Sequence, residues 1–364
     1  MDKKVTFIFN EGRISRLMNK DKYPKDFFYS YHLFKNEFDD VGIIELNSKT
    51  NGIIFLIFKF IRKISNIPIF SEGLMKYTKI KDIFNSDTLI ATNQNIAFSL
   101  LPIILLKKIF RKTDLVFFVM GLVDNSKDIQ INKLIINSLL KNTKSLIFLS
   151  KKELNQAFKL FPKYNEKFLY IPFCIDTEYW SKKEITINEK KVLFIGNDKN
   201  RDYDFAIELA EKMKDYEFTF VTDKIKDPNL ENLTFLNGNW REEIVSDSSI
   251  KNLYKENFLT IVPLIKNHQP SGQSVTLQSI STGTPVLITM TEGFWDEKLF
   301  KNDENIFVLS GNDLEKWEEK IENIYNNRVL YNKVQSEGAD LVRGKLNLNY
   351  LYSELKNLIF KVSF

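Results

Sequence analysis

Cysteine and histidine are scarce in this chain of 364 residues. It has one cysteine, Cys174, and two histidines, His32 and His268. A single cysteine excludes an internal disulfide and a cysteine-based zinc site, and it fits a reducing compartment. Apolar runs are short, because none reaches the roughly 18–20 uncharged residues that a membrane span needs. Since a strand-like segment starts at residue 4, we expect no signal peptide and a cytoplasmic location.

Motifs for several common ligands are missing as well. Gly196 follows the apolar run 190–195, but the Gly-x-Gly-x-x-Gly spacing of a dinucleotide site does not occur there, which argues against an NAD enzyme. No Asp-x-Asp metal motif stands out, so we expect neither a metal nor another cofactor. No recognisable module with clustered basic and aromatic residues is present, and we therefore expect no nucleic-acid partner.

Acidic residues are under-represented in the first half of the chain. Residues 1–180 hold 28 Lys and Arg against 18 Asp and Glu, whereas the whole chain holds 52 and 47. The second half is therefore mildly acidic. Such an asymmetry predicts a polyanionic partner for the first half, which is a membrane surface, a lipid phosphate or a nucleic acid.

The imbalance is strongest in residues 51–113, where ten Lys or Arg and three Asp or Glu lie among apolar runs. Segments 52–60 and 98–112 each join bulky apolar residues to basic ones. Helices of this composition can lie in a bilayer interface, with their lysines on anionic headgroups. The alternative is that both are core helices with solvated lysine ends. We favour a peripheral contact with an anionic membrane through residues 51–113.

The stretch 258–290 has the pattern strand, loop, helix, tight turn, strand. It opens with an apolar run, Phe258 to Ile265, that is typical of a buried parallel strand. Ser271 is predicted to cap the amino end of the helix. Gly283 is predicted to end the helix in the left-handed conformation, and Pro285 blocks its continuation.

The amino end of this predicted helix is a candidate anion site. Free N–H groups and the helix dipole favour negative charge where a helix starts at the carboxyl end of a parallel strand. Ser271, Ser274 and Gln278 share one helix face, and Gly272 lets a ligand approach the backbone. A polar face on an otherwise buried helix suggests a ligand. The alternative is an ordinary βαβ crossover in which the serines only cap.

This stretch resembles the nucleotide-sugar site of GT-B glycosyltransferases, particularly the large retaining group called family 4. In that group a Glu-containing loop with Gly precedes a helix with a second Glu eight residues on, and Gly-x-Pro-Val follows. Here residues 283–286 read Gly-Thr-Pro-Val, and Gln278 stands at the place of the second Glu. Pro270, after His268 and Gln269, stands at the place of the first. The chain thus resembles a variant in which the Glu pair is replaced and the loop reads Ser-Gly-Gln.

The resemblance implies an α/β fold of the GT-B type. In this fold two Rossmann-like, doubly wound parallel-sheet domains face a central cleft. We expect an N-terminal acceptor-binding domain at 1–178 and a C-terminal nucleotide-sugar-binding domain at 179–348. Residues 349–364 are expected to form a helix that packs back on the first domain.

The resemblance also implies a donor site in the second domain. In the family a basic residue shortly after the first glycine of this domain binds the donor diphosphate. Arg201 is the best match, and its forked guanidinium suits phosphate. The alternative is a surface Arg paired with Asp202 or Asp204. We assign catalysis to Arg201 and His268, although His268 is equally compatible with an ordinary loop residue, and we expect Gln278 to hold the ribose. The residues expected to bind the donor are Gly196, Asn197, Arg201, Asn237, Gly238, Ser271, Gly272, Gln273, Ser274 and Gln278.

Other candidate residues are less specific. Glu11 and Gly12 follow the first strand, and the resemblance places their loop on the acceptor side of the cleft. His32 lies either near the acceptor or on an ordinary amphipathic helix. Trp240 lies in a loop that resembles the base-contacting loop of the family, where it can stack on a ligand or form a hydrophobic lid. Asp124 stands near the place of a family cleft histidine, and we interpret it as a surface carboxylate.

The function implied is transfer of a sugar from a nucleotide-diphosphate donor to a lipid-linked or cell-envelope glycan. We expect a retaining, metal-independent hexosyltransferase that works in the cytoplasm, peripherally on the inner face of the cell membrane. Two alternatives use the same fold. One is a catalytically silent subunit of a glycan-assembly complex, and the other is a nucleotide-sugar epimerase.

Overall fold

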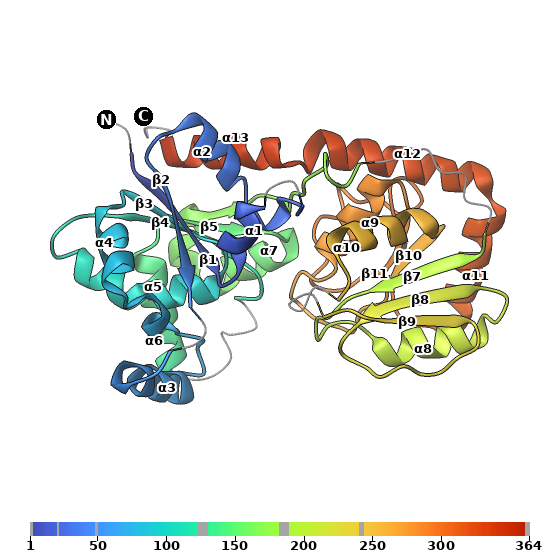
Figure 1. Cartoon of the computed structure of the whole chain (residues 1–364), viewed down its shortest axis with the longest axis horizontal. Coiled ribbons are helices and arrows are strands. Elements are labelled where there is room, and N and C mark those ends of the chain that lie inside the picture. Colours follow the sequence, from blue (N-terminus) through green and yellow to red (C-terminus); the bar gives the residue numbers. More distant parts are fainter. Residues whose placement is uncertain are drawn as a thin grey trace. The chain divides into compact units, whose positions relative to one another are not determined.

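The computed structural model describes residues 3–19, 22–47, 50–122, 130–181, 189–239 and 244–360. The chain divides into two compact units. Unit 1 comprises Met1–Pro172 together with Leu351–Phe364, and unit 2 comprises Phe173–Tyr350. Each unit contains a six-stranded sheet whose paired strands are all parallel, with helices packed around it (Figure 1).

The sheet of unit 1 has the strand order β2-β1-β3-β4-β5-β6. The inner strands β1, β3, β4 and β5 are almost fully buried, as expected for parallel strands covered by helices on both faces, whereas the edge strands β2 and β6 are partly exposed. The strands are β1 Val5–Asn10, β2 Val41–Leu46, β3 Thr88–Ala91, β4 Asp114–Val119, β5 Ser145–Phe148 and β6 Phe168–Tyr170. The α-helices are α1 Arg13–Met18, α2 Tyr31–Glu37, α3 Ile53–Ser65, α4 Tyr77–Asn85, α5 Gln94–Lys107, α6 Gln130–Lys141, α7 Lys151–Leu160 and α13 Leu348–Phe360. Short 3-10 helices are η1 Asp26–Phe28, η2 Ser71–Leu74 and η4 Pro162–Lys167.

The sheet of unit 2 has the order β12-β11-β10-β7-β8-β9. The chain therefore starts at a central strand, moves outward to one edge, and then returns to fill the other edge, which is the doubly wound pattern. The strands are β7 Lys191–Ile195, β8 Glu217–Thr222, β9 Leu233–Asn237, β10 Leu259–Val262, β11 Val286–Thr289 and β12 Phe307–Leu309. The helices are α8 Tyr203–Lys212, α9 Asp247–Glu256, α10 Gln273–Thr282, α11 Leu314–Asn326 and α12 Arg328–Lys345.

The last helix, α13, follows unit 2 in sequence but packs in unit 1. Its buried face includes Leu355 and Ile359, both 0% exposed. On its outer side, Tyr352 and Lys356 both contact the carboxylate of Glu37, which lies at the end of α2. These contacts place α13 in unit 1, although it is the last helix in the sequence.

The two apolar, basic segments of residues 51–113 have different environments. Helix α3 is amphipathic and lies with much of its apolar surface exposed, which agrees with a surface helix. Helix α5, in contrast, contributes Phe98 to Ile104 to the buried core of unit 1. The interpretation of 98–112 as a surface helix is therefore wrong for its first half. In the second half Leu105, Leu106 and residues 108–112 are exposed, whereas Lys107 is buried. Within the described ranges, no helix is long and apolar enough to cross a bilayer.

Candidate functional site

The candidate site lies where the chain of unit 2 reverses its direction across the sheet. Strands β7 and β10 are neighbours there, with Leu193 aligned to Thr260, although β8 and β9 come between them in sequence. The crossovers leaving the two strands go to opposite sides of this point. Ligands of open α/β sheets bind at such a switch point. The loops 196–202 and 263–272 begin there.

A short backbone pairing joins these two loops. Arg201 and Leu264 form an antiparallel bridge. The amide of Asp202 donates to the carbonyl of Pro263 at 3.0 Å, and the amide of Ile265 donates to the carbonyl of Asn200, also at 3.0 Å. The predicted strand over 258–265 is therefore too long, because β10 ends at Val262 and the following residues pair with the first loop instead. This pairing carries Arg201 toward the start of α10.

Helix α10 is capped by Gly272, so the prediction of Ser271 as the cap is wrong. Gly272 has a φ of 75° and a ψ of −1°, and no side chain caps the helix. A Cβ atom at this position would lie 2.8 Å from Cγ1 of Val262. The left-handed backbone and the close strand together require glycine. Because no side chain caps the helix, its first N–H groups keep the arrangement that favours an anion at a helix start.

Ser271 is used to hold the loop rather than to cap the helix. Its hydroxyl accepts a hydrogen bond from Nδ2 of Asn200 at 2.7 Å and donates to the carbonyl of Gln269 at 3.3 Å. Its own carbonyl accepts from the indole Nε1 of Trp295 at 3.1 Å. Asn200 and Trp295 thus position this end of α10. Neither residue is predictable as part of the site from the sequence, because nothing in the local pattern ties a residue of one loop to another so distant in the chain.

Arg201 lies directly beside this helix end. Its side chain is 2% exposed, and Nη1 would be 3.5 Å from a Cβ placed on Gly272. A Cβ on Gly196 would lie 2.4 Å from Nε of Arg201. Glycine at 196 therefore makes room for the guanidinium stem. The alternative of a surface Arg paired with Asp202 or Asp204 is wrong, since the side chain is buried between the two loops.

Arg201 has one acidic partner and spare donor capacity. Its Nη1 is 2.9 Å from a carboxylate oxygen of Asp198, and its Nε donates weakly to the carbonyl of Ile195 at 3.4 Å. Within the described part of the chain, Nη1 has no hydrogen-bond partner of good geometry. A guanidinium has five N–H donors, so a phosphate oxygen could accept hydrogen bonds from those that are left. Asp198, which is 42% exposed, would compete with that phosphate.

Gln278 lies in α10, one helical turn after Ser274, and is buried. Its Oε1 accepts a hydrogen bond from the hydroxyl of Tyr254 on α9 at 3.2 Å. Tyr254 in turn packs edge-on against Trp180, with ring centroids 5.9 Å apart. The amide of Gln278 is therefore oriented by the interior of unit 2. Gln273 and Ser274, in the first turn of the same helix, are partly exposed.

His268 lies in the loop before α10, 41% exposed, with its Nε2 3.1 Å from Oε2 of Glu292. Glu292 belongs to the loop after β11. The next residue, Gly293, approaches the loop 263–272 closely, because a Cβ there would lie 2.3 Å from the carbonyl oxygen of Gln269. The segment after β11, which includes Glu292, Gly293 and Trp295, therefore holds the loop that carries His268 in place.

Asn197, Asn237 and Gly238 form a second group at the same edge of the sheet. Nδ2 of Asn197 donates to the carbonyl of Gly238 at 2.5 Å, and its Oδ1 accepts from the amide of Asp223 at 2.9 Å. Oδ1 of Asn237 accepts from the amide of Asn239 at 3.1 Å. These bonds tie together the loops that follow β7, β8 and β9. Trp240 lies outside the described residues, as does Asp124 of unit 1.

One triplet with the spacing Asp-x-Asp, Asp202-Tyr203-Asp204, was passed over in the sequence prediction. Asp202 caps α8 by accepting from the amide of Phe205 at 3.2 Å, and its other oxygen accepts from Nδ2 of Asn312 at 2.6 Å. Among the described residues, no three acidic, His or Cys side chains are grouped as a metal site requires.

The acceptor-side candidates belong to unit 1. Glu11 and Gly12 are exposed and follow β1 at the carboxyl edge of that sheet. Gly12 caps α1 with a φ of 90°. Because β1 lies between β2 and β3, this loop also marks a reversal of strand order.

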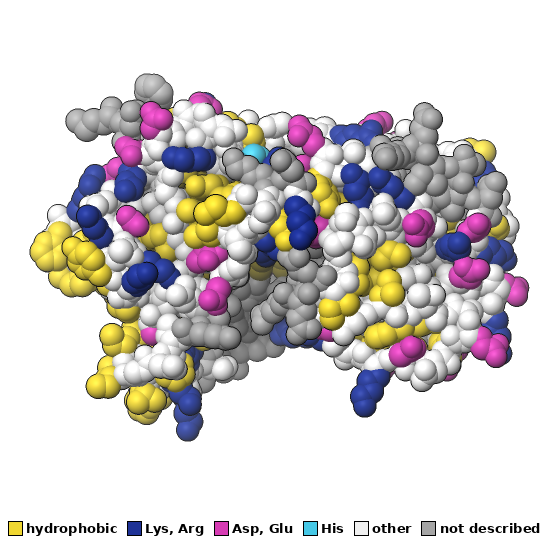
Figure 2. Space-filling model, viewed as in Figure 1, with side chains coloured by type: hydrophobic (Ala, Val, Ile, Leu, Met, Phe, Trp, Pro, Cys, Tyr) yellow, Lys and Arg dark blue, Asp and Glu magenta, His cyan; other side chains and the backbone are white. Residues whose placement is uncertain are grey.

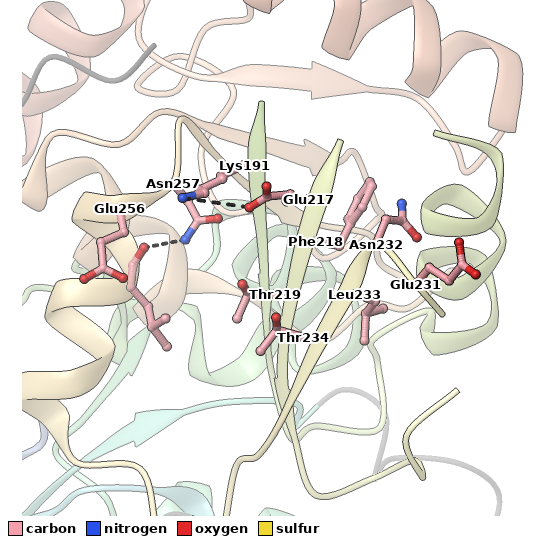
Figure 3. A pocket seen from close by; sticks show the side chains of 11 residues that line it. Lys191, Glu217, Phe218, Thr219, Glu231, Asn232, Leu233, Thr234, Glu256 and Asn257 are labelled. Carbon is pink, nitrogen blue, oxygen red and sulfur yellow. Dashed lines mark hydrogen bonds and ion pairs between the residues drawn. The ribbon is translucent and has the colours of Figure 1, made fainter. Parts of the chain in front are cut away.

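A separate cavity lies at the opposite edge of the unit 2 sheet (Figure 3). Its volume is about 410 Å³, and Lys191, Glu217 and Leu233 at the amino ends of β7, β8 and β9 line it. Lys191 and Glu217 face each other across part of it, with Nζ 3.8 Å from the carboxylate. The cavity lies at the amino ends of these parallel strands, whereas Arg201 and Gly272 lie at the carboxyl ends. The two places therefore share no loop.

Comparisons with known proteins give structural matches without sequence matches. No protein-family model and no curated protein matches the chain. HepE from Anabaena, solved with UDP-glucose, superposes with a TM-score of 0.70 at 11% identity, covering 97% of this chain and 98% of that one. A glycosyltransferase from Rickettsia africae gives 0.67 at 16% identity over all of both chains. Sucrose-phosphate synthase from Thermosynechococcus elongatus gives 0.68 at 11% identity over 98% of each.

The fold is GT-B. Two six-stranded parallel sheets with surrounding helices match these structures over nearly the whole chain, so the predicted fold class is confirmed. Identities this low show a shared fold alone, and membership of family 4 stays a prediction. In this GT-B chain, Arg201 and the amino end of α10 lie together at the switch point of the second sheet.

Proposed function

We propose that this GT-B protein is a glycosyltransferase that uses a nucleotide-diphosphate sugar. The observation that carries the proposal is the buried guanidinium of Arg201 beside the amino end of α10, which no side chain caps. A departing nucleoside diphosphate develops negative charge on its phosphate oxygens, and fixed N–H donors and cations stabilise such charge. HepE, which shares the fold, has been solved with UDP-glucose and with UDP and glucose.

Each candidate residue has a role in this proposal. Arg201 and the backbone amides of Gly272 to Ser274 hold the diphosphate. Gln278, fixed by Tyr254, offers its amide to the ribose, since an amide can hydrogen-bond two hydroxyls. His268 contacts the donor sugar from the loop above. The loop with Asn197, Asn237 and Gly238 lies on the base side of the donor.

The transfer is proposed to be of a hexose, with retention at the anomeric carbon and without a metal. The acceptor is a lipid-linked or cell-envelope glycan that approaches the loop of Glu11 and Gly12 in unit 1. A basic, apolar first unit supports this acceptor class. The protein works in the cytoplasm, peripherally on the inner face of the membrane, through the exposed part of residues 51–113 that helix α3 forms. No cofactor takes part, because the donor is itself the substrate.

Ligand binding tests the diphosphate site directly. UDP, GDP, ADP and dTDP, each also as a sugar conjugate, are compared by thermal shift, because a ligand of the folded state raises stability by mass action. We expect one nucleotide diphosphate to raise the melting temperature. Arg201→Lys keeps the charge but loses the fork, so it should weaken this binding by about tenfold or more.

Lys199→Gln is the matched control. Lys199 lies in the same loop but is exposed, and its loss should leave nucleotide affinity unchanged. Equal binding by Arg201→Lys and the wild type, or no binding of any nucleotide diphosphate, would contradict the proposal. Binding without donor hydrolysis or transfer would instead identify a catalytically silent subunit.

A further inference from the structure

Helix α3 has one broad apolar face, of which only a part is buried. Phe58 and Ile61 face the core of unit 1, where Phe58 is 9% exposed and Ile61 packs against the cluster. The adjoining part of the same apolar face carries Ile53, Ile57 and Phe60, which are 78%, 52% and 64% exposed. An amphipathic helix of a globular domain normally presents polar residues on the side away from the core. On α3 that side carries Lys59 and Lys63, but a broad apolar sector between it and the core is exposed as well.

The outer apolar residues form one continuous stripe. At 100° per residue, Ile53, Ile57, Phe60 and Ile64 fall within a narrow sector, and Leu56 borders it. We call this set of exposed side chains the α3 stripe. Figure 2 shows hydrophobic side chains gathered at the lower left, where Figure 1 places α3, with Lys and Arg beside them.

The charges around the stripe are of one sign. Lys59 and Lys63 are exposed and lie on the flank next to Leu56. No Asp or Glu occurs between Glu45 and Glu72 in the sequence. Two copies of this surface would therefore bring like charges together, whereas an anionic surface would complement them.

The helix is held firmly enough to transmit such a contact to unit 1. Nη1 of Arg62 donates to the carbonyl of Ile69 and to Oε1 of Glu72, both at 2.6 Å. The guanidinium also stacks on Phe70, with its carbon 4.5 Å from the ring centroid. Arg62 thus fixes α3 from the inner side and leaves the two lysines for an outside partner.

We propose that the α3 stripe inserts into the interface of an anionic lipid bilayer, with Lys59 and Lys63 on the phosphate headgroups. The helix lies parallel to the membrane plane, and its outer apolar side chains enter the boundary between headgroups and acyl chains. The overall basic charge of the first half of the chain explains attraction to an anionic membrane but requires no exposed Ile or Phe. Insertion explains the exposed apolar side chains as well. The assignment of the stripe is independent of the identity of the donor.

Vesicle binding by matched variants tests this assignment. Sedimentation uses vesicles of phosphatidylcholine with 30% phosphatidylglycerol, prepared as a stated test composition of roughly one anionic lipid in three. The wild type should bind, and Ile57→Ser with Phe60→Ser should bind about tenfold or more weakly. Val329→Ser is the control, because Val329 is 82% exposed on α12 of unit 2 and lies outside the stripe.

A spectroscopic readout separates insertion from simple attraction. Phe60→Trp should shift its emission to the blue on vesicle addition and be quenched by brominated acyl chains, while Val329→Trp should show neither change. Raised salt should weaken binding without abolishing it, because only the lysine contribution is screened.

Several results would overturn the proposal. These are equal vesicle binding by the double serine variant and the wild type, or a Phe60→Trp emission that ignores lipid. A wild-type dimer in light scattering that the serine variant turns into a monomer would show that a second copy covers the stripe. Nucleotide binding, measured without lipid, should be the same in all these variants, so failure here is distinct from failure of the donor-site proposal.

Discussion

At the scale of single residues, two buried cations show how differently this fold uses positive charge. Lys107, at the end of α5, is 1% exposed, and its ammonium donates to the carbonyls of Ile83 and Ser86 at 2.8 and 2.5 Å. Those carbonyls lie at the end of α4, so the lysine ties two helices together. Arg201 has an acidic partner and spare donors at a sheet edge where ligands bind. The first arrangement stabilises the unit, and the second is suited to an anion.

Lys107 makes stability depend on pH in a defined direction. Burial, with a smaller contribution from nearby Arg111, lowers the pKa of Lys107 to about 8 from 10.5. Between these values the unfolded chain holds a proton that the folded chain has lost, so the free energy of unfolding rises with pH there. Lys107→Met has no such group. The free energy of unfolding of the wild type, minus that of Lys107→Met, should therefore rise from pH 8 to pH 10.

Urea unfolding at pH 7.5, 9 and 10 measures this difference. Lys108→Met is the control, because Lys108 is exposed, and its difference from the wild type should stay flat. A constant difference for Lys107→Met across the range would contradict the buried ammonium.

At the scale of elements, α12 contains two glycines in opposite environments. A Cβ at Gly338 would lie 2.7 Å from the carbonyl oxygen of Asn305 and 3.1 Å from Cγ2 of Ile280 on α10. At Gly344 no atom lies within 4 Å of that position. The first glycine lets α12 approach α10, the helix whose amino end forms the candidate site. The second makes no close contact.

Alanine at these two positions should act in opposite directions. Gly338→Ala should lower the free energy of unfolding by about 1–3 kcal/mol, because backbone would have to move. Gly344→Ala should raise it by about 0.5–1 kcal/mol, because alanine is the better helix former. Urea unfolding of both variants checks the pair. A loss of stability in Gly344→Ala as large as that in Gly338→Ala would show that the close approach to α10 is not the cause.

At the scale of the whole molecule, the chain completes its first unit last. Helix α13 returns to unit 1, where Phe38 and Phe360 stack with ring centroids 4.7 Å apart and Phe34 packs edge-on against Tyr352 at 4.8 Å. Unit 1 is therefore not finished until the C-terminal residues are present. The donor-site candidates lie entirely in unit 2 and do not depend on these contacts.

Leu355→Ala should destabilise unit 1 selectively. Leu355 is 0% exposed, and removing such a side chain costs about 2–5 kcal/mol. Hydrogen exchange should show faster exchange in the strands of unit 1, with those of unit 2 unchanged. Asn357→Ala, at an exposed position of the same helix, should alter neither unit. Loss of protection in unit 2 instead would contradict the assignment of α13.

Much of the fold can be read from local pattern. Buried parallel strands are short apolar runs rich in branched residues, and 41–46, 217–222 and 286–289 were close to predictable on that basis. The turn that ends α10 was predictable too, since Gly283 has a φ of 97°. The predicted strand over 258–265 is too long, because the apolar residues beyond Val262 pair with another loop. An apolar strand and an apolar loop that pairs in this way have the same sequence pattern.

The candidate site was only partly predictable. Ser271 has the composition of a helix cap, and yet Gly272 occupies that position because the strand beside it leaves no room for a Cβ. Arg201 looked compatible with a surface salt bridge, since two acidic residues follow it. Its burial depends on the backbone bridge to Leu264, which no local pattern records. Asn200 and Trp295 were missed for the same reason.

The sequence by itself determined the two parallel sheets and the turn after α10, because hydrophobic runs, glycine and proline act on their immediate neighbours. Only the tertiary structure decided which side chains meet at the switch point of the second sheet. Arg201 reaches the start of α10 because two loops, far apart in the chain, pair at the ends of adjacent strands. Such pairing depends on strand order, and strand order is a property of the folded sheet.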